Sequence, residues 1–233
     1  MAKRGGSRHY KRLTVPVNIP VIGRKHIQWL LSPKPGPHAR DQAMALGVLL
    51  RDVLKVGDDL REVKKAITAG SIKVDGKVVR DVRRPIGLMD IIEIPKMGKT
   101  WRMQILGGRL MPKEIEGSLA KHKLCKVVGK TTMKGKQVQI SLHDGRTMKA
   151  DDSVKMGATL RMSMPQFKLE QQMPLQPGVR CLITSGKHAG EIATMESIIE
   201  RVGSMDSESR MRAGSESFIT VTKYLFVVDD QFA

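Results

Sequence analysis

Three stretches of the sequence imitate the end of a phosphate-binding loop, in which a glycine directly precedes a lysine. They are Gly98-Lys99-Thr100, Gly129-Lys130-Thr131 and Gly186-Lys187-His188. A complete loop of this kind carries another glycine five residues earlier, so that consecutive backbone amides can surround the phosphates. Glu93, Leu124 and Cys181 occupy that earlier position. The sequence therefore argues against a nucleotide hydrolase.

Two further groupings suggest a metal site and an acid–base pair when each is considered alone. His122 and Cys125 are close in sequence, but Cys181 lies far along the chain and no second pair has the spacing of a zinc site. His143 precedes Asp144 in a glycine-bounded turn that contains no nucleophile motif. We expect no catalytic residue, no metal, no cofactor and no small-molecule substrate.

The total charge of the chain points to a polyanionic partner. The 233 residues include 41 Lys and Arg against 23 Asp and Glu, which gives a net charge of +18 and a pI near 10.2. Residues 1–40 carry nine of the basic residues and no acid, whereas residues 171–233 carry a net charge of −2. This distribution favours nucleic acid as the partner. Because aromatic residues make up only 3%, we expect contacts with the backbone and shape of folded RNA rather than stacked bases.

Cysteine usage and hydropathy predict a soluble cytoplasmic protein. The two cysteines, Cys125 and Cys181, form no CxxC pair, so we expect a reducing compartment and no disulfide framework. The longest apolar run is Ala43 to Leu50. It is far shorter than the roughly 20 residues that a membrane-spanning helix requires, so we expect no membrane partner.

The most regular pattern lies between residues 43 and 94, where we expect two short helices, a hairpin and a strand. The first helix is predicted from apolar residues at helical spacing, namely Leu46, Leu49, Leu50, Val53 and Leu54. Asp59 and Glu62 form a capping box at the start of a second helix over residues 60–67. The Asp75-Gly76 pair is typical of a two-residue hairpin turn.

The segments on either side are less regular. In the basic segment before residue 42 we expect a short helix at residues 29–31 and an arm that becomes ordered on RNA, so that removal of residues 1–25 weakens assembly without unfolding the rest. After residue 96 the pattern predicts a β-rich region, with a short helix from Pro112 to about Lys121. A closing strand is expected around residues 218–228.

Two of these regions resemble known RNA-associated modules. Residues 43–94 resemble the S4-type RNA-binding domain, on the strength of the 60–67 helix, the segment 70–77 and the segment 87–92. Residues 177–193 resemble the KOW motif, in which Gly190 stands at the family's glycine position and Ala193 replaces a frequent glycine. The first resemblance implies RNA binding, and the second implies a small SH3-like barrel.

The order of the modules resembles the S4e family of archaeal and eukaryotic small-subunit ribosomal proteins over essentially the whole chain. The resemblance implies an α+β, multi-module fold. It comprises a basic arm (1–41), an S4-type domain (42–96), a central β-rich domain (97–172) and an SH3-like KOW barrel (173–233). It also implies a non-enzymatic constituent of the small ribosomal subunit that binds and stabilises small-subunit ribosomal RNA (rRNA) beside neighbouring ribosomal proteins.

The expected mechanism is electrostatic neutralisation of folded RNA by clustered cations. The candidate RNA-binding residues are Arg4, Arg8, Lys11, Arg12, Arg24, Lys25, His38, Arg61, Lys64, Lys65, Lys73, Lys77, Arg80, Arg83, Arg84, Lys123, Lys126 and Arg146. An isolated Lys or Arg is usually only a solvated surface charge, so the prediction rests on their clustering.

Two other functions are compatible with parts of the pattern. Pseudouridine synthases carry similar RNA-binding units, but their catalytic carboxylate follows a Gly-Arg-Leu sequence. Here Gly108-Arg109-Leu110 is followed by Met111, which cannot supply a carboxylate. A KOW-bearing transcription elongation factor would not explain the S4-type unit or the arm without acids. Both alternatives are disfavoured.

Overall fold

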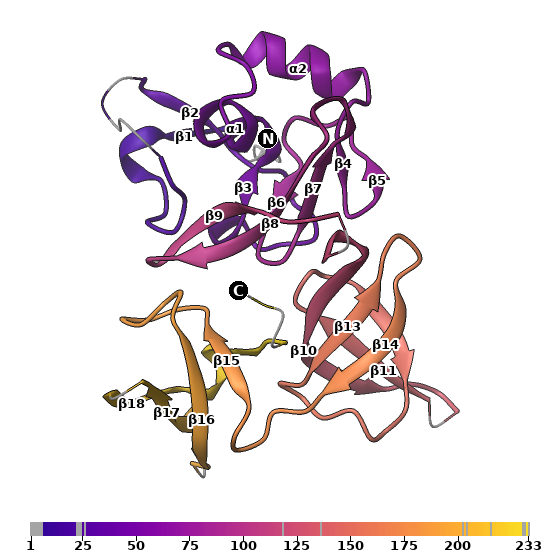
Figure 1. Cartoon of the computed structure of the whole chain (residues 1–233), viewed down its shortest axis with the longest axis vertical. Coiled ribbons are helices and arrows are strands. Elements are labelled where there is room, and N and C mark those ends of the chain that lie inside the picture. Colours follow the sequence, from indigo (N-terminus) through magenta and orange to yellow (C-terminus); the bar gives the residue numbers. More distant parts are fainter. Residues whose placement is uncertain are drawn as a thin grey trace, which may run out of the picture. The chain divides into compact units, whose positions relative to one another are not determined.

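The computed structural model in Figure 1 is built mainly of antiparallel strands. It describes residues 7–21, 25, 27–117, 119–135, 137–201, 203, 205–214, 216–229 and 232. The chain divides into two compact units, one comprising Met1–Gln104 with Arg109–Lys121 and the other comprising Ile105–Gly108 with His122–Ala233. Each unit has its own sheets and is described by itself.

The first unit contains a five-stranded sheet, two short strand pairs and two helices. Its sheet has the order β5-β4-β7-β8-β9, with β4 at Lys73–Val74, β5 at Lys77–Val78, β7 at Ile91–Ile94, β8 at Lys99–Leu106 and β9 at Arg109–Glu114. The pairs are β1 (His9–Lys11) with β2 (Trp29–Leu31) and β3 (Met44–Ala45) with β6 (Pro85–Ile86). The helices are α1 (Leu46–Val48) and α2 (Leu60–Thr68). Short 3₁₀ turns lie at Arg12–Thr14, Arg40–Gln42, Pro95–Met97 and Leu119–Lys121.

The first predicted helix is present but is not a regular α-helix. After α1 the backbone widens into a π-helical turn over Leu49–Val53, where the Leu54 amide donates to the Leu49 carbonyl at 2.9 Å. Leu49 and Leu50 are completely buried, so the apolar stripe faces the core as predicted. Leu46 is buried as well, whereas Val53 and Leu54 are only half-buried, and the spacing did not predict the wider turn.

Helix α2 agrees closely with the predicted 60–67 helix, although its first turn is capped differently. Val63 and Ile67 form its buried face. Asp59 makes no side-chain capping bond, and the Glu62 carboxylate accepts a hydrogen bond from the Asp58 amide at 3.3 Å. The predicted reciprocal box is therefore wrong: Glu62 caps the amide one residue before Asp59, and the Asp59 side chain caps none. Gly70, with a φ of +77°, ends the helical segment in the left-handed conformation.

The hairpin between β4 and β5 forms as predicted. Asp75 and Gly76 have φ values of +51° and +70°, the two positive values that a type I′ turn requires. Asp75 is also buried, and its carboxylate accepts a hydrogen bond from the Ile91 amide at 3.1 Å. The turn residue thus joins the hairpin to the neighbouring strand β7.

Two predicted helices of the first unit are strands instead. Trp29–Leu31 forms β2, which pairs with β1, so these residues are not an anchoring helix. Pro112 lies within β9, and only Leu119–Lys121 forms a helical turn of the 3₁₀ type. Since β9 is the edge strand of its sheet, a proline without an amide hydrogen is tolerated there.

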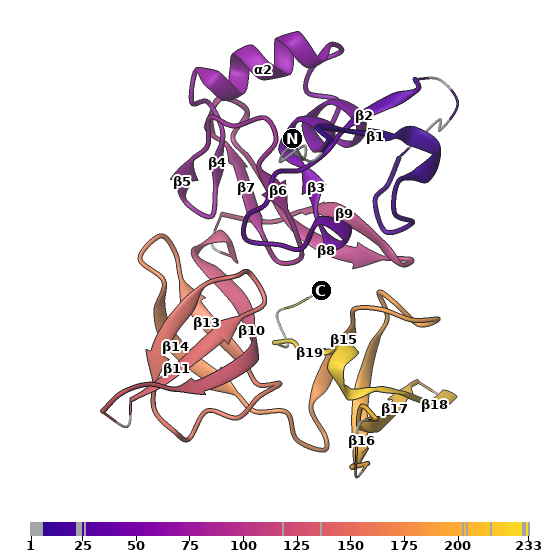
Figure 2. The ribbon, with the colours of Figure 1, turned by 180° about the vertical axis from the view of Figure 1, so that it is seen from behind.

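The second unit contains two five-stranded antiparallel sheets, seen from behind in Figure 2. The first has the order β12-β11-β10-β13-β14, with β10 at His122–Thr132, β11 at Val138–Leu142, β12 at Thr147–Ala150, β13 at Thr159–Ser163 and β14 at Lys168–Met173. Its core includes Cys125, Ile140 and Leu160. The strand alternation predicted for residues 138–142 is present in β11, whose residues are alternately buried and half-buried.

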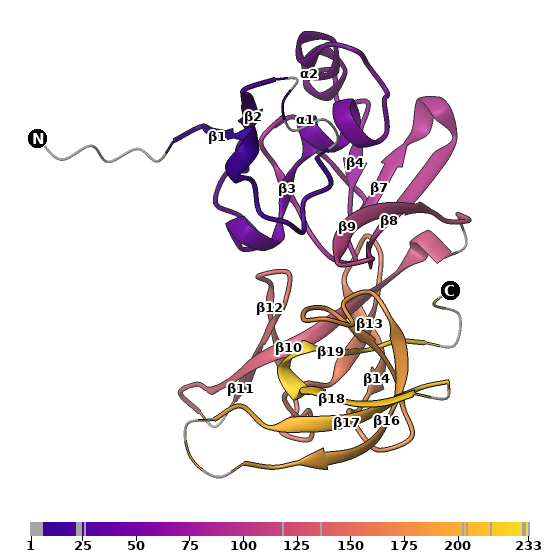
Figure 3. The same cartoon turned by 90° about the vertical axis from the view of Figure 1, so that its left-hand side faces the viewer.

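The second sheet of this unit holds the KOW-like segment. Its order is β18-β17-β16-β15-β19, with β15 at Arg180–Ile183, β16 at Ile192–Ile199, β17 at Glu208–Ala213, β18 at Glu216–Val221 and β19 at Leu225–Val227. Figure 3 shows β16, β17 and β18 side by side. The single closing strand expected at 218–228 is interrupted by a 3₁₀ turn at Thr222–Tyr224. Gly190 has a φ of +96°, which suits glycine at this position.

Candidate nucleic-acid interface

The outward side of α2 carries three of the predicted cations. Successive residues of an α-helix are about 100° apart, so Arg61, Lys64 and Lys65 fall within roughly one third of its circumference. All three side chains are exposed, whereas Val63 and Ile67 lie on the opposite side against the core. The amphipathic sequence therefore presents a cationic stripe to solvent.

The hairpin continues this stripe beyond the end of the helix. Lys77 and Arg80 are exposed, and Lys73 is half-buried. A Cβ atom on Gly70 would lie 3.1 Å from Val78 and 3.8 Å from the Arg80 Nε atom, so the hairpin adjoins the end of α2. We define the α2–hairpin surface as the exposed cations of these two elements, namely Arg61, Lys64, Lys65, Lys77 and Arg80.

Arg83 joins the loop after the hairpin to the N-terminal segment. Its Nε atom donates to the Ser32 carbonyl at 2.9 Å, and Lys34 lies 2.6 Å from the Asp81 carboxylate. Burial raises the pKa of Asp81, but hydrogen bonds from Lys34 and the Arg83 amide outweigh it and hold that pKa below its ordinary value. Arg83 and Arg84 are both half-buried. Arg83 therefore makes internal contacts that its sequence position did not suggest.

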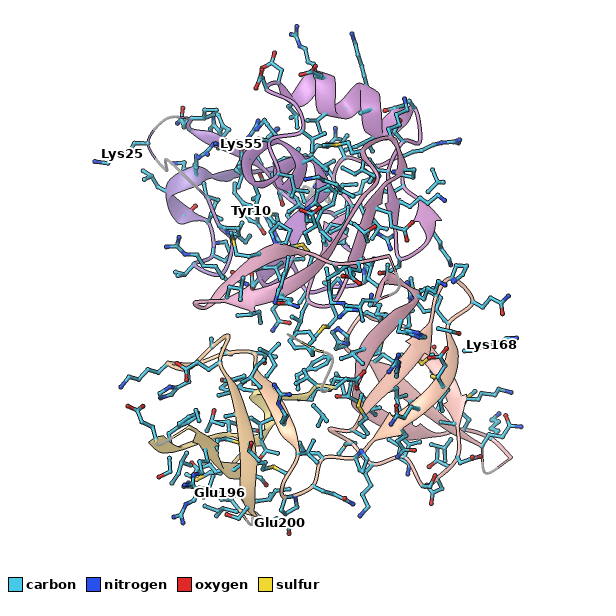
Figure 4. The ribbon with its side chains drawn as sticks, viewed as in Figure 1. Tyr10, Lys25, Lys55, Lys168, Glu196 and Glu200 are labelled. Carbon is cyan, nitrogen blue, oxygen red and sulfur yellow. The ribbon has the colours of Figure 1, made fainter. Side chains whose placement is uncertain are left out.

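The N-terminal segment separates its predicted cations into buried and exposed groups. Arg8, Lys11 and Lys25 are exposed, and Figure 4 labels Lys25 on the outside of the first unit. Arg12 is only 5% exposed and lies 3.9 Å from the Asp52 carboxylate. Two further candidates, Arg4 and Arg24, lie outside the described residues. Arg12 is thus held inside the unit rather than presented to a partner.

His38 is also an internal residue. Its Nε2 atom lies 2.9 Å from the Asp90 carboxylate, which also accepts a hydrogen bond from the Gly87 amide at 2.9 Å. Both side chains are almost completely buried. A buried histidine–carboxylate pair of this kind positions the chain. Because the His38 ring is not exposed, the structure does not support the predicted RNA contact at this residue.

The candidate cations of the central region make contacts within the second unit. Lys123 has no exposed side-chain surface, and its Nζ atom lies 3.5 Å from the buried Asp144 carboxylate. Arg146 is half-buried, with Nε 3.5 Å from the same carboxylate and its guanidinium over the Phe167 ring. The Lys123–Asp144 and Arg146–Phe167 pairings join residues that are distant in sequence, so no local pattern could reveal them.

Lys126 connects the two sheets of the second unit. Its Nζ atom donates hydrogen bonds of 2.7 Å to the carbonyl oxygens of Lys223 and Leu225. Burial lowers the pKa of Lys126 to about 8, an effect that Cys181 opposes and Lys223 strengthens. Burial also raises the pKa of the Cys181 thiol to about 12, which keeps it protonated and unreactive. All three central candidates therefore have structural partners.

No group of three His, Cys, Asp or Glu side chains in the described part of the chain is arranged to hold a metal ion. Within those same residues, no helix has the length and apolar character needed to cross a membrane. A hollow in the first unit is lined partly by Arg8, Lys34, Arg40 and Arg83, which adds positive charge near β1.

The chain is similar in sequence to members of one family of ribosomal proteins. The model of the ribosomal family S4e matches residues 101–169. A small ribosomal subunit protein eS4 from Methanothermobacter thermautotrophicus is 36% identical over 230 residues, covering 98% of this chain and 95% of the relative. The corresponding Methanocaldococcus jannaschii protein is also 36% identical, covering 99% of this chain and 98% of the relative.

A solved structure extends the similarity to the fold. The crystal structure of the 30S ribosomal protein S4e from Thermoplasma acidophilum is 34% identical in sequence and superposes with a TM-score of 0.72. The match covers 81% of this chain and 95% of that one. The similarity therefore extends well beyond the central segment that the family model matches.

Proposed function

This chain belongs to the S4e family of small-subunit ribosomal proteins, and we propose that it binds and stabilises small-subunit rRNA through the α2–hairpin surface. It is a structural constituent of the cytoplasmic small ribosomal subunit and not an enzyme. Its partners are rRNA and neighbouring ribosomal proteins. The pseudouridine synthase and elongation factor alternatives are set aside, because the family accounts for nearly the whole chain.

The observation that carries the proposal is the clustering of exposed cations on α2 and the adjoining hairpin. Folded RNA presents phosphates at regular spacing, and each phosphate neutralised by Lys or Arg releases counterions. Five exposed cations lie on α2 and on the chain that adjoins its end, enough charge to neutralise several phosphates. Arg8, Lys11 and Lys25 supply further exposed positive charge in the same unit.

The proposal also assigns a role to each part of the chain. We assign the S4-type role to residues 42–96, a β-rich core to 97–172 and a KOW-type SH3-like module to 173–233, preceded by the segment 1–41. The last module has a slight net negative charge. It therefore suits solvent or a neighbouring protein better than rRNA.

Sedimentation of ribosomal subunits tests the proposed function. The protein should sediment in a one-to-one ratio with small subunits and should remain bound after a wash at moderately raised salt. Its purified form should also bind small-subunit rRNA transcribed in vitro. Absence from washed subunits, together with failure to bind that rRNA, would contradict the proposal.

A further inference from the structure

An exposed tryptophan lies on the outer face of the β1–β2 ribbon. Trp29 is 49% exposed, although tryptophan is on average a highly buried residue. The strand register places Lys11 directly opposite Trp29, and the His9 and Trp29 rings lie in a T-shaped arrangement with centroids 6.5 Å apart. His9, Lys11 and Trp29 share one face of the ribbon with the half-buried Leu31, and we call this the Trp29 face.

The other face of the ribbon is occupied by the protein itself. Leu30 is 2% exposed, and its cross-strand partner Tyr10 is half-buried. The Tyr10 ring packs under the guanidinium of Arg40, whose Nε atom donates to the Tyr10 hydroxyl at 2.7 Å. Because the inner face fixes the ribbon to the unit, the Trp29 face is held outward on a supported element.

The surroundings of Trp29 are suited to a nucleic acid. Arg8 precedes His9 and is exposed, as are Lys11 and Lys25, and residues 1–40 contain no acid. A protein partner would have to supply acids of its own to pair with this cationic rim, since residues 1–40 contain none. A base brings a flat ring for the indole together with a phosphate for the adjacent cations.

We propose that Trp29 stacks on an unpaired base of small-subunit rRNA while Lys11 and Arg8 contact the flanking phosphates. The proposal rests on the proposed function, since it assigns a recognition mode to the same partner. It also qualifies the expectation of backbone contacts alone, because the scarce aromatic residues include one in an exposed and cationic position.

Binding affinity gives the first test, with small-subunit rRNA transcribed in vitro as the probe. Trp29→Ala should weaken binding about 5- to 150-fold, the range found for loss of one stacked base, while Trp29→Phe should retain most of the affinity. Ile27→Ala is the matched control, because Ile27 is similarly exposed at 48% but carries no ring. It should bind as the wild type does. All variants must unfold at the wild-type temperature.

Fluorescence gives a second test that does not depend on affinity. Trp101 is the other tryptophan and is only 7% exposed, so Trp101→Phe leaves Trp29 as a single exposed reporter. Stacking on a base should quench its emission when rRNA is added. Quenching in wild-type protein by the same rRNA checks that the substitution has not altered the fold.

Several outcomes would overturn the stacking proposal. Wild-type rRNA affinity in Trp29→Ala would overturn it and leave the proposed function intact, because the cations alone would then account for binding. Unchanged Trp29 emission with rRNA, but altered emission in whole subunits, would assign this face to a neighbouring protein instead. Failure of the wild-type protein to bind rRNA would overturn both proposals.

Discussion

Lys123 and Asp144 illustrate how individual charges act in this protein. Their side chains are 0% and 1% exposed, and the charged atoms lie 3.5 Å apart. Both charges have lost their hydration, so each depends on the other, and Asp144 also accepts a hydrogen bond from the Arg146 amide at 3.2 Å. Removal of Lys123 leaves the buried Asp144 carboxylate with less compensation, from Arg146 at 3.5 Å.

Substitution of Lys123 should therefore affect folding. We expect Lys123→Met to lower the free energy of unfolding by about 3–5 kcal/mol, as for other buried ion pairs that lose one partner. The exposed Lys121 provides a matched control, and Lys121→Met should stay within about 0.5 kcal/mol of wild type. Urea unfolding of the three proteins measures both values. Equal stability of the Lys123 and Lys121 variants would contradict the role assigned to the pair.

Lys126 predicts a specific dependence of stability on pH. Unfolded lysine keeps its proton up to about pH 10.5, whereas in the folded protein the pKa of Lys126 is about 8. Between these values the unfolded state binds more protons, so the contribution of this group to stability rises with pH. The free energy of unfolding of wild type relative to Lys126→Met should therefore increase from pH 8 to pH 10. A difference that is constant or decreases would contradict the assigned environment.

The sequence predicted which residues are cationic but not which of them are available. Arg61, Lys64 and Lys65 could be placed on the outward side of α2, because helical spacing puts them on the side opposite Val63 and Ile67. Arg12 and Lys123 could not be distinguished from them, because their partners Asp52 and Asp144 are brought close only by the tertiary fold. The tertiary fold therefore determines which cations are available to bind a partner.

At the scale of elements, local patterns succeeded where local interactions determine the conformation. The periodicity of α2 and the Asp75-Gly76 turn are both decided within a few residues. The segment at Trp29 was predicted incorrectly because its conformation depends on pairing with β1. Pro112 is typical of a helix start, but the edge position of β9 allows it in a strand.

Gly87 shows how closely two segments approach inside the first unit. A Cβ atom at this position would lie 2.3 Å from the His38 ring, which is itself fixed by Asp90. We expect Gly87→Ala to lower the free energy of unfolding by roughly 1–3 kcal/mol through overpacking. At Gly117 a Cβ atom meets nothing within 4 Å, so Gly117→Ala should be nearly neutral. Thermal unfolding compares the two, and a neutral Gly87→Ala would show that the His38 ring can move aside.

At the scale of the whole molecule, the N-terminal segment is part of the first unit. Val15, Ile19 and Val21 are buried, and the Asn18 carbonyl accepts a hydrogen bond from the Leu110 amide at 2.7 Å. The expectation that residues 1–25 could be removed without unfolding the rest conflicts with these contacts. The charge of the segment suggested an arm, but its scattered apolar residues belong to a core.

Deletion of residues 1–21 should consequently destabilise the protein. The deletion removes three buried side chains, which exposes the residues that they pack against. It also removes β1, so β2 loses its paired strand. We expect a clear fall in the midpoint of thermal unfolding, measured by circular dichroism, in addition to weaker rRNA binding. An unchanged midpoint would show that the segment contributes to binding alone.

The central claim is that the α2–hairpin surface neutralises rRNA phosphates, and salt-dependent binding tests it most directly. Wild-type affinity for small-subunit rRNA should fall by orders of magnitude between about 50 and 200 mM salt if roughly six to ten phosphates are contacted. Lys64→Ala with Lys65→Ala should weaken binding and reduce the slope of log K against log salt by about one per lost phosphate contact. The matched control is Arg210→Ala with Arg212→Ala, which removes two exposed charges from β17. The account predicts an unchanged slope for that control; equal effects of the two double variants, or affinity independent of salt, would contradict it.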